Sequence, residues 1–265
     1  MATDSISRRA TFGAATLAAS AAASPAIAQP ASPRTFVLVH GAYHGGWCWR
    51  RVADILEGRG HRVYAQSLTG LGDRSHLLSK DVVLDTHIAD IVNLVTWEDL
   101  KDICLVVHSY GGFPGSGALE HIHDRVASIV WLDAFKPENG QKEMDYASPF
   151  GRQGIQEGLA KGEAGHSPPP ARTFSFSEKD YAWLESKMTP HPIGTAIQPI
   201  RLTGKRDTVA RKTYIRAPRY PQPAFDKALA ECRADKSWQT IVNESSGHDV
   251  MVDQPEWLAN ILMKA

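Results

Sequence analysis

The sequence predicts an α/β fold with a mostly parallel sheet, because short apolar runs alternate with longer amphipathic ones along most of the 265 residues. Residues 36–39, 103–107 and 129–132 have the length and apolar character of buried strands. The alternation breaks between about 137 and 202, where Gly, Pro and Ser are frequent, and we predict an inserted lid there. A hydrophobic content of 43% with 22% charged residues is typical of a globular enzyme and not of a disordered chain.

Each predicted strand outside the lid is followed by a segment with helical periodicity. The predicted strands cover residues 36–39, 61–65, 103–107, 129–132, 213–216 and 240–242. The predicted helices cover residues 47–56, 85–96, 115–123, 177–188, 224–234 and 256–263. The lid contributes only one of these helices, residues 177–188, and Ser177 is its predicted N-cap. Strands that alternate with helices in this way form βαβ units.

The first 28 residues have the pattern of an export signal and not of a folded element. Arg8 and Arg9 precede an Ala-rich apolar stretch that ends in small residues, as at a cleavage site. The paired arginines resemble a twin-arginine signal, so we expect a periplasmic or secreted protein. The apolar stretch is too short to leave a membrane anchor. Residues 29–34 then form a linker to one folded domain over 35–265.

The charge balance argues against polyanionic partners. The 29 basic and 29 acidic side chains cancel, and removal of the signal changes the net charge only to −1. Nucleic acids and anionic membranes require a basic surface, so we expect neither as a partner. The three cysteines, Cys48, Cys104 and Cys232, match neither a disulfide framework nor metal-ligand spacing. We therefore predict no metal and no cofactor.

Ser109 lies between an apolar strand and a predicted helix, and Gly111 follows it. On such a sharp turn the serine Oγ is exposed above the sheet, and the next backbone N–H, that of Tyr110, can bind an oxyanion. The usual glycine two residues before the serine is replaced by Val107, which local repacking must accommodate. Similar turns also occur in non-catalytic α/β proteins, so this motif alone leaves the role of Ser109 open.

Two further strand ends supply groups that complete a hydrolytic site. The glycine-rich run HGAYHGG follows the first strand, and its Ala42 N–H is the predicted second oxyanion donor. A dinucleotide site is the competing interpretation of such a loop, but the G-x-G-x-x-G pattern is absent. His248 follows the last predicted strand, and from there it can reach Ser109 as general base.

Five segments together resemble the α/β-hydrolase superfamily: FVLVHGAYHGGWCW, TGLGDRSH, VVHSYGGF, WLDAFKPENGQ and GHDVMVDQPEWLA. More narrowly, they are similar to the group of plant methylesterases, hydroxynitrile lyases and bacterial pyrethroid- and carbendazim-type hydrolases. The resemblance covers residues 35–263 and is weakest in the lid. It implies the α/β-hydrolase fold, a Ser–His–acid triad without a metal, and ester hydrolysis through an acyl-enzyme.

The acid of this triad has two main candidates, and Asp207 is a weaker third because it precedes the strand predicted at 213–216. In many members of the superfamily it follows the strand that here covers 213–216, and the first carboxylate after that strand is Asp226, within a predicted helix. Other members place the acid one strand earlier, where this chain has Asp133 directly after an apolar run. We predict that Asp133 orients His248 and stabilises its imidazolium. The alternatives are that Asp133 only caps the start of the lid, or that Asp226 is the acid.

The resemblance also helps to distinguish between the reaction types that this fold supports. Dehalogenases and epoxide hydrolases of this fold use an aspartate nucleophile, whereas this chain has Ser109. Hydroxynitrile lyases carry a lysine beside the catalytic histidine and a threonine at the position of Gly41, whereas here Asp249 follows His248. We therefore predict hydrolysis of a small, largely apolar carboxylic ester, with carbamates and amides as further candidates. A lyase, or a non-catalytic relative that binds a small ligand, is the alternative.

Aromatic side chains of the lid and the strand ends are candidates to line the substrate pocket. The predicted substrate-binding residues are Tyr43, Phe113, Phe135 and Trp183, with Phe150, Phe174 and Phe176 as further aromatic candidates. Aromatic residues also pack the underside of a lid whether or not a substrate binds there. No feature of the sequence predicts an oligomeric state.

Overall fold

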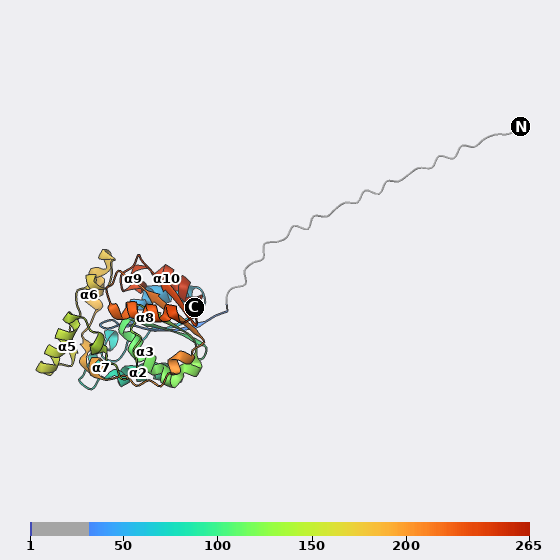
Figure 1. Cartoon of the computed structure of the whole chain (residues 1–265). Coiled ribbons are helices and arrows are strands. Elements are labelled where there is room, and N and C mark those ends of the chain that lie inside the picture. Colours follow the sequence, from blue (N-terminus) through green and yellow to red (C-terminus); the bar gives the residue numbers. More distant parts are fainter. Residues whose placement is uncertain (2–31) are drawn as a thin grey trace. The chain divides into compact units, whose positions relative to one another are not determined.

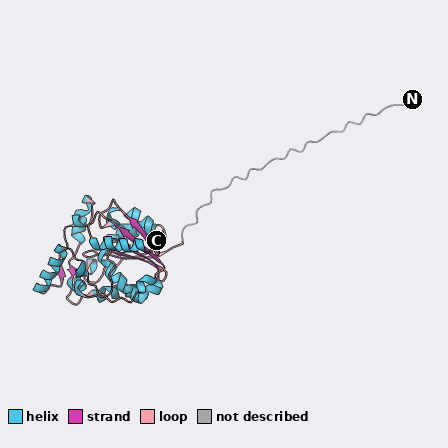
Figure 2. Cartoon of the chain, viewed as in Figure 1, coloured by secondary structure: helices cyan, strands magenta, loops and turns pink. Residues whose placement is uncertain are grey.

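A six-stranded sheet, with every neighbouring pair of strands parallel, forms the centre of the protein (Figure 2). Its strand order is β2-β1-β3-β4-β7-β8. The strands are β1 (Thr35–Val39), β2 (Arg62–Tyr64), β3 (Ile103–His108), β4 (Val126–Leu132), β7 (Arg211–Arg216) and β8 (Trp238–Val242). The predicted α/β architecture with a mostly parallel sheet is confirmed, because all six predicted strands belong to this sheet.

The structure is a computed structural model, and it describes Met1 and residues 32–265. The predicted export signal, residues 1–28, lies outside the described residues apart from Met1, so it stays a prediction. Residues 33–265 form one compact unit.

Helices cover both faces of the sheet, and the side chains of the central strands alternate between them. Val37, Leu105 and Val107 point to one face, where they pack with α2 (Leu84–Trp97), α3 (Gly112–Ile122) and α8 (Pro223–Ala234). Leu38 and Val106 point to the other face. That face is covered by α1 (Arg50–Gly58), α9 (Val250–Asp253) and α10 (Pro255–Leu262). This two-sided burial explains why the strand sequences are continuous apolar runs.

The segment between β4 and β7 holds the remaining helices, three of which, α5, α6 and α7, are grouped at one side of the unit in Figure 1. Its elements are α4 (Glu143–Tyr146), α5 (Pro149–Lys161), β5 (Gly165–His166), α6 (Tyr181–Lys187), β6 (His191–Pro192) and α7 (Ile193–Ile197). Strands β5 and β6 pair antiparallel in a separate two-stranded sheet. We refer to residues 133–210 as the lid, because they leave the central sheet after β4 and rejoin it at β7.

The lid differs from its prediction at two points. The helix predicted at 177–188 is only α6, preceded by a single 3-10 turn. Ser177 Oγ donates a hydrogen bond to Asp180 Oδ2 (2.5 Å) and accepts none from a helix N–H, so Ser177 is not a side-chain N-cap. The longer helix α5 was not predicted, because three glycines weaken its helical pattern. Ser148 caps it by accepting from the Gly151 N–H, and Pro149 occupies its first position.

Candidate active site

Ser109 lies at the carboxyl end of β3, on the turn that leads into α3. Its φ of +53° is a left-handed conformation that non-glycine residues rarely adopt, which is typical of a serine held at a sharp strand-to-helix turn. Two neighbouring glycines allow the turn. A Cβ on Gly111 would lie 2.8 Å from the His40 carbonyl oxygen, and a Cβ on Gly112 would lie 1.9 Å from that of Phe135. Both positions therefore require glycine.

Val107 is accommodated by a glycine one helical turn into α3. A Cβ on Gly115 would come within 2.4 Å of Val107 Cγ1, so the missing side chain in the helix makes room for the branched side chain in the strand. Both residues are fully enclosed. The expected repacking around Val107 thus consists of an exchange of small and large residues between strand and helix.

His248 and Asp133 form a buried pair beside this turn. His248 Nδ1 lies 2.6 Å from Asp133 Oδ2, and the two residues are 2% and 0% exposed. Asp133 directly follows β4 with a φ of +44°. Its other carboxylate oxygen accepts hydrogen bonds from the Ala217 N–H (2.9 Å) and from Arg216 Nη1 (2.7 Å). The carboxylate is therefore held by three donors and aimed at the imidazole.

Asp226 does not contact His248. It lies in the first turn of α8, its side chain is 60% exposed, and its carboxylate accepts from Arg216 Nε at 2.8 Å. Arg216 thus binds both acid candidates, but only Asp133 reaches the histidine. The geometry brings together Ser109, His248 and Asp133 and leaves Asp226 at the surface.

The His248 ring is fixed by stacking. The ring of Tyr220 lies parallel to it, with centroids 4.2 Å apart, and His108 packs at a centroid distance of 4.4 Å. His108 Nε2 also donates to the His248 carbonyl (3.1 Å), and burial lowers the pKa of His108 well below its usual value, so this ring is neutral. Neither His248 Nε2 nor Ser109 Oγ makes a hydrogen bond within residues 32–265, and both residues line the same cavity.

The loop after β1 runs directly against Ser109. A Cβ on Gly41 would lie 2.8 Å from the Ser109 Cβ, and the Ala42 N–H makes no backbone hydrogen bond to another described residue. His40 holds the peptide group that carries this N–H. Its Nε2 accepts from the Leu68 N–H (2.9 Å), so its Nδ1 carries the proton and donates to the Gly41 carbonyl (2.8 Å). Burial lowers the pKa of His40 to about 3, which keeps the ring neutral.

A second histidine–aspartate pair lies in the same wall of the cavity. His44 Nε2 is 3.0 Å from Asp249 Oδ2, and His44 Nδ1 is 2.8 Å from the Ala42 carbonyl oxygen. Burial alone would lower the pKa of His44, but the charge of Asp249 and both hydrogen bonds outweigh it and raise the pKa. The pKa of Asp249 falls to about 2, because the charge and hydrogen bond of His44 outweigh its burial. His44 is therefore an imidazolium, with both N–H groups engaged.

The cavity above Ser109 has a volume of about 80 Å³ and is lined by residues of the strand ends and the lid. Tyr43 and Phe135, two of the predicted substrate-binding residues, line it. Phe113 and Trp183 do not, and these predictions are wrong in placement. Phe113 points from α3 into the core and packs behind Phe135, with ring centroids 5.8 Å apart. Trp183 packs edge-on against Trp47, at 5.2 Å.

The cavity lining contains residues that the sequence reasoning missed. Of the three further aromatic candidates, Phe174 lines the cavity, whereas Phe150 and Phe176 are exposed. The additional lining residues include Tyr220 and Phe225 beside His248, and Glu143, Tyr146 and His166 from the lid. Tyr220 carried a readable signal, because it lies between two prolines directly after a predicted strand. Glu143 carried none, since α4 has only four residues.

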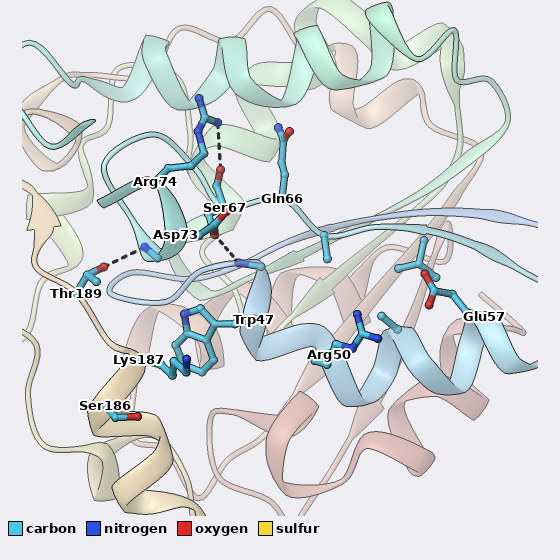
Figure 3. A pocket seen from close by; sticks show the side chains of 15 residues that line it. Trp47, Arg50, Glu57, Gln66, Ser67, Asp73, Arg74, Ser186, Lys187 and Thr189 are labelled. Carbon is cyan, nitrogen blue, oxygen red and sulfur yellow. Dashed lines mark hydrogen bonds between the residues drawn. The ribbon is translucent and has the colours of Figure 1, made fainter. Parts of the chain in front are cut away.

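A larger and more polar pocket of about 650 Å³ lies elsewhere on the surface (Figure 3). Charged side chains line it, among them Arg50, Glu57, Asp73, Arg74 and Lys187. Trp47, labelled in Figure 3, lines this pocket. Its ring stacks on His44, which lines the cavity above Ser109, with centroids 5.2 Å apart. The stacked pair thus separates the two spaces. Ser109, Asp133 and His248 do not line the larger pocket.

Within residues 32–265 no group of three or more His, Cys, Asp and Glu side chains is placed to bind a metal ion. The helices of this part of the chain also fall short of the length and apolar character that crossing a bilayer requires.

Comparisons with known proteins agree with the fold. The model of the Alpha/beta hydrolase family matches residues 36–261. The chain is 36% identical over 236 residues to a carbendazim hydrolyzing esterase of Nocardioides sp. (strain SG-4G), which covers 86% of this chain and 97% of that protein. It is 26% identical over 255 residues to the putative methylesterase 15 of Arabidopsis thaliana, with 88% of this chain and 57% of the relative covered.

Solved structures show the same fold. An extracellular alpha/beta-hydrolase from a Paenibacillus species superposes with a TM-score of 0.76 at 23% identity, covering 88% of this chain and 99% of that one. A PytH variant superposes with a TM-score of 0.65 at 19% identity, over 88% and 97% of the two chains. The esterase relatives support a carboxylic-ester hydrolase. By the match to the family model and the similarity along nearly its whole length, this chain belongs to the alpha/beta hydrolase family.

Proposed function

We propose that the protein is a serine esterase that cleaves a small, largely apolar carboxylic ester through an acyl-enzyme on Ser109. The observation that carries this proposal is the state of His248. Asp133 holds its Nδ1, the Tyr220 ring stacks on the imidazole and the His108 ring packs against it. Its Nε2 has no hydrogen-bond partner in the described chain, and the residue lines the same cavity as Ser109. An imidazole held in this way keeps the tautomer that a general base requires.

In the acylation step, His248 Nε2 takes the proton of Ser109 Oγ as the oxygen attacks the ester carbonyl. Asp133 stabilises the imidazolium that forms. The Ala42 and Tyr110 N–H groups bind the developing oxyanion, and the loss of one such donor costs about 3 kcal/mol of barrier. His40 supports this step, because its hydrogen bond polarises the peptide group that carries the Ala42 N–H.

The tetrahedral intermediate then collapses, and His248 returns its proton to the leaving alkoxide. A water molecule takes the place of the alcohol, and His248 accepts its proton as it attacks the acyl-enzyme. A second collapse releases the carboxylic acid and restores Ser109. Each proton is exchanged at His248 Nε2, so no other titratable group is needed for the cycle.

The cavity walls and the relatives together support the substrate class. Phe135, Phe174 and Phe225 give the cavity aromatic walls, which favour an apolar acyl or alkyl group. The similarity to a carbendazim hydrolyzing esterase supports the inclusion of carbamate esters. The cavity volume of about 80 Å³ favours a small organic group at this position.

Covalent trapping tests the proposal. The protein is incubated with an organophosphonate, and its intact mass is measured in parallel with turnover of small aryl and methyl esters. We expect one adduct, on Ser109, and loss of both adduct and turnover in Ser109→Ala. Ester turnover that survives Ser109→Ala, with no adduct on the wild type, would favour acid–base chemistry without a nucleophile and defeat the proposal.

A further inference from the structure

The lid side of the catalytic cavity carries a carboxylate that its neighbours do not satisfy. Glu143, the first residue of α4, lines the cavity and is 9% exposed. Its Oε2 is buried and makes no hydrogen bond within the described residues. His191 Nε2 lies 3.4 Å from this oxygen but is bound to Thr195 Oγ1 at 2.9 Å. A buried carboxylate oxygen without a donor is costly, and a donor on a molecule bound in the cavity would remove this cost.

Two tyrosine hydroxyls near Glu143 are committed elsewhere. Burial raises the pKa of Tyr43 and of Tyr110, and the charge of Glu143 adds to both shifts. The Tyr110 hydroxyl donates to His87 Nδ1 (2.9 Å), because His87 Nε2 already donates to the Thr69 carbonyl. The Tyr43 hydroxyl is bonded to His166 Nδ1 (3.2 Å). Neither hydroxyl serves the carboxylate.

A second unsatisfied group lies at the same end of the cavity. His166 lines the cavity and is 5% exposed, and its Nε2 is buried without a hydrogen-bond partner among residues 32–265. Burial lowers the pKa of His166 to about 4, helped by nearby His191, so the ring is neutral near pH 7. The lid end of the cavity therefore carries polar groups that lack hydrogen-bond partners in the described chain, whereas the walls beside His248 are aromatic.

We propose that Glu143 determines the specificity of this cavity by accepting a hydrogen bond from a planar N–H group of the substrate. The inference rests on the proposed esterase function and names its substrate class: small esters whose acyl part is a heteroaromatic ring or an amide-like group with an N–H. A flat group suits the aromatic walls, and its N–H satisfies the carboxylate. An ester of equal shape without the donor leaves Glu143 unpaired and is disfavoured.

A pair of isosteric esters tests this inference. We measure kcat/KM for methyl pyrrole-2- and 3-carboxylate and for the corresponding methyl thiophene carboxylates, in which sulfur replaces the N–H. The pyrrole-to-thiophene ratio is then compared between the wild type and Glu143→Leu, so that the intrinsic reactivities of the esters cancel. We expect the ratio to fall about 10- to 100-fold for at least one isomer, which is the range for a hydrogen bond to a charged group.

Three further measurements keep the test decisive. Glu143→Gln retains an acceptor oxygen without the charge and should give an intermediate ratio, which also covers failure of Glu143→Leu to fold. Glu157→Gln, an exposed carboxylate of α5, is the matched control and should leave the ratio unchanged. Organophosphonate labelling of Ser109 in each variant reports on the esterase site separately.

The outcomes distinguish the two proposals. If the ratio changes less than about threefold for both isomers in both Glu143 variants, the inference is overturned, while labelled Ser109 leaves the esterase proposal standing. If the wild type turns over none of the four esters, the inference is also overturned. If Ser109 is then unlabelled as well, the proposed function fails with it.

Discussion

Two buried histidine–aspartate pairs face the same cavity and have opposite properties. His248 lies 2.6 Å from Asp133, and His44 lies 3.0 Å from Asp249. All four residues are at most 2% exposed. The difference is in the second ring nitrogen, because His44 Nδ1 binds the Ala42 carbonyl oxygen whereas His248 Nε2 has no partner in the described chain.

The chemistry of a buried histidine therefore depends on whether the ring nitrogen that does not face the carboxylate has a hydrogen-bond partner. A ring with one free nitrogen can take a proton and return it, whereas a ring that donates from both nitrogens stays charged and acts as a fixed support. By this reasoning, we propose that His248 is the base and that His44 positions the loop that carries Ala42. These roles can be distinguished by replacing Asp133 and His44, with Asp249 replaced together with His44 as a control.

The largest effect is expected for Asp133→Asn. The amide leaves the packing in place but no longer holds the required tautomer of His248, and it removes the buried negative charge that faces Arg216. We expect kcat to fall about 10⁴-fold, as for the loss of the carboxylate in other triads. Steady-state kinetics on a small ester, with circular dichroism as the folding check, measure this. A loss below about tenfold would show that Asp133 does not serve the base.

A smaller effect on turnover and a larger one on stability are expected for His44→Gln. The loop after β1 shifts slightly, so kcat should fall by no more than about 100-fold. Because Asp249 is left buried and unpaired, the free energy of unfolding should fall by about 3–5 kcal/mol. Urea denaturation at pH 6 measures it. The double variant His44→Gln/Asp249→Asn should recover most of the lost stability. If His44→Gln instead lowered kcat as much as Asp133→Asn does, the two pairs would not differ in their roles.

The same pair predicts how this stability difference depends on pH. The pKa of Asp249 is lowered from its ordinary 3.8 to about 2, so its contribution is present above pH 3.8 and is lost as the pH falls through 2. The pKa of His44 is raised above 6.5, so its contribution is complete below pH 6.5 and is lost as the pH rises through the raised value. The difference between wild type and His44→Gln should therefore be greatest between about pH 4 and 6.5.

The sequence predicted those parts of the site that depend on the order of strands. Ser109, Asp133 and His248 each follow a strand, and the carboxyl ends of parallel strands meet at one edge of a sheet, so their proximity could be expected before the structure was known. The fold followed from the same alternation of strands and helices. The sequence also predicted that the side chain of Val107 needs extra space, and the structure provides this space at Gly115.

The parts that could not be predicted depend on contacts between irregular segments. His44 and Asp249 are 205 residues apart on two loops, and no periodicity links them. Helix α5 contains glycines at 151, 154 and 158, and its formation depends on its caps and on packing of Gly158 against Ile193. Phe113 was misplaced because a helix position close to the serine can point into the core. In each case tertiary packing outweighs the local signal.

The smallest effect is expected for Asp226→Asn, the other candidate acid. Its side chain is 60% exposed, and Arg216 keeps its bonds to Asp133 and to the carbonyls of Ala217 and Tyr220 when Asp226 is neutralised. Because the Asp226 carboxylate is exposed to water, its ion pair with Arg216 contributes at most about 1 kcal/mol, so kcat/KM should change by less than about fivefold. Both aspartate variants are assayed side by side at one pH. A greater loss for Asp226→Asn than for Asp133→Asn would mean that the acid of the active enzyme comes from α8, and the contrast between the two buried pairs would then not describe catalysis.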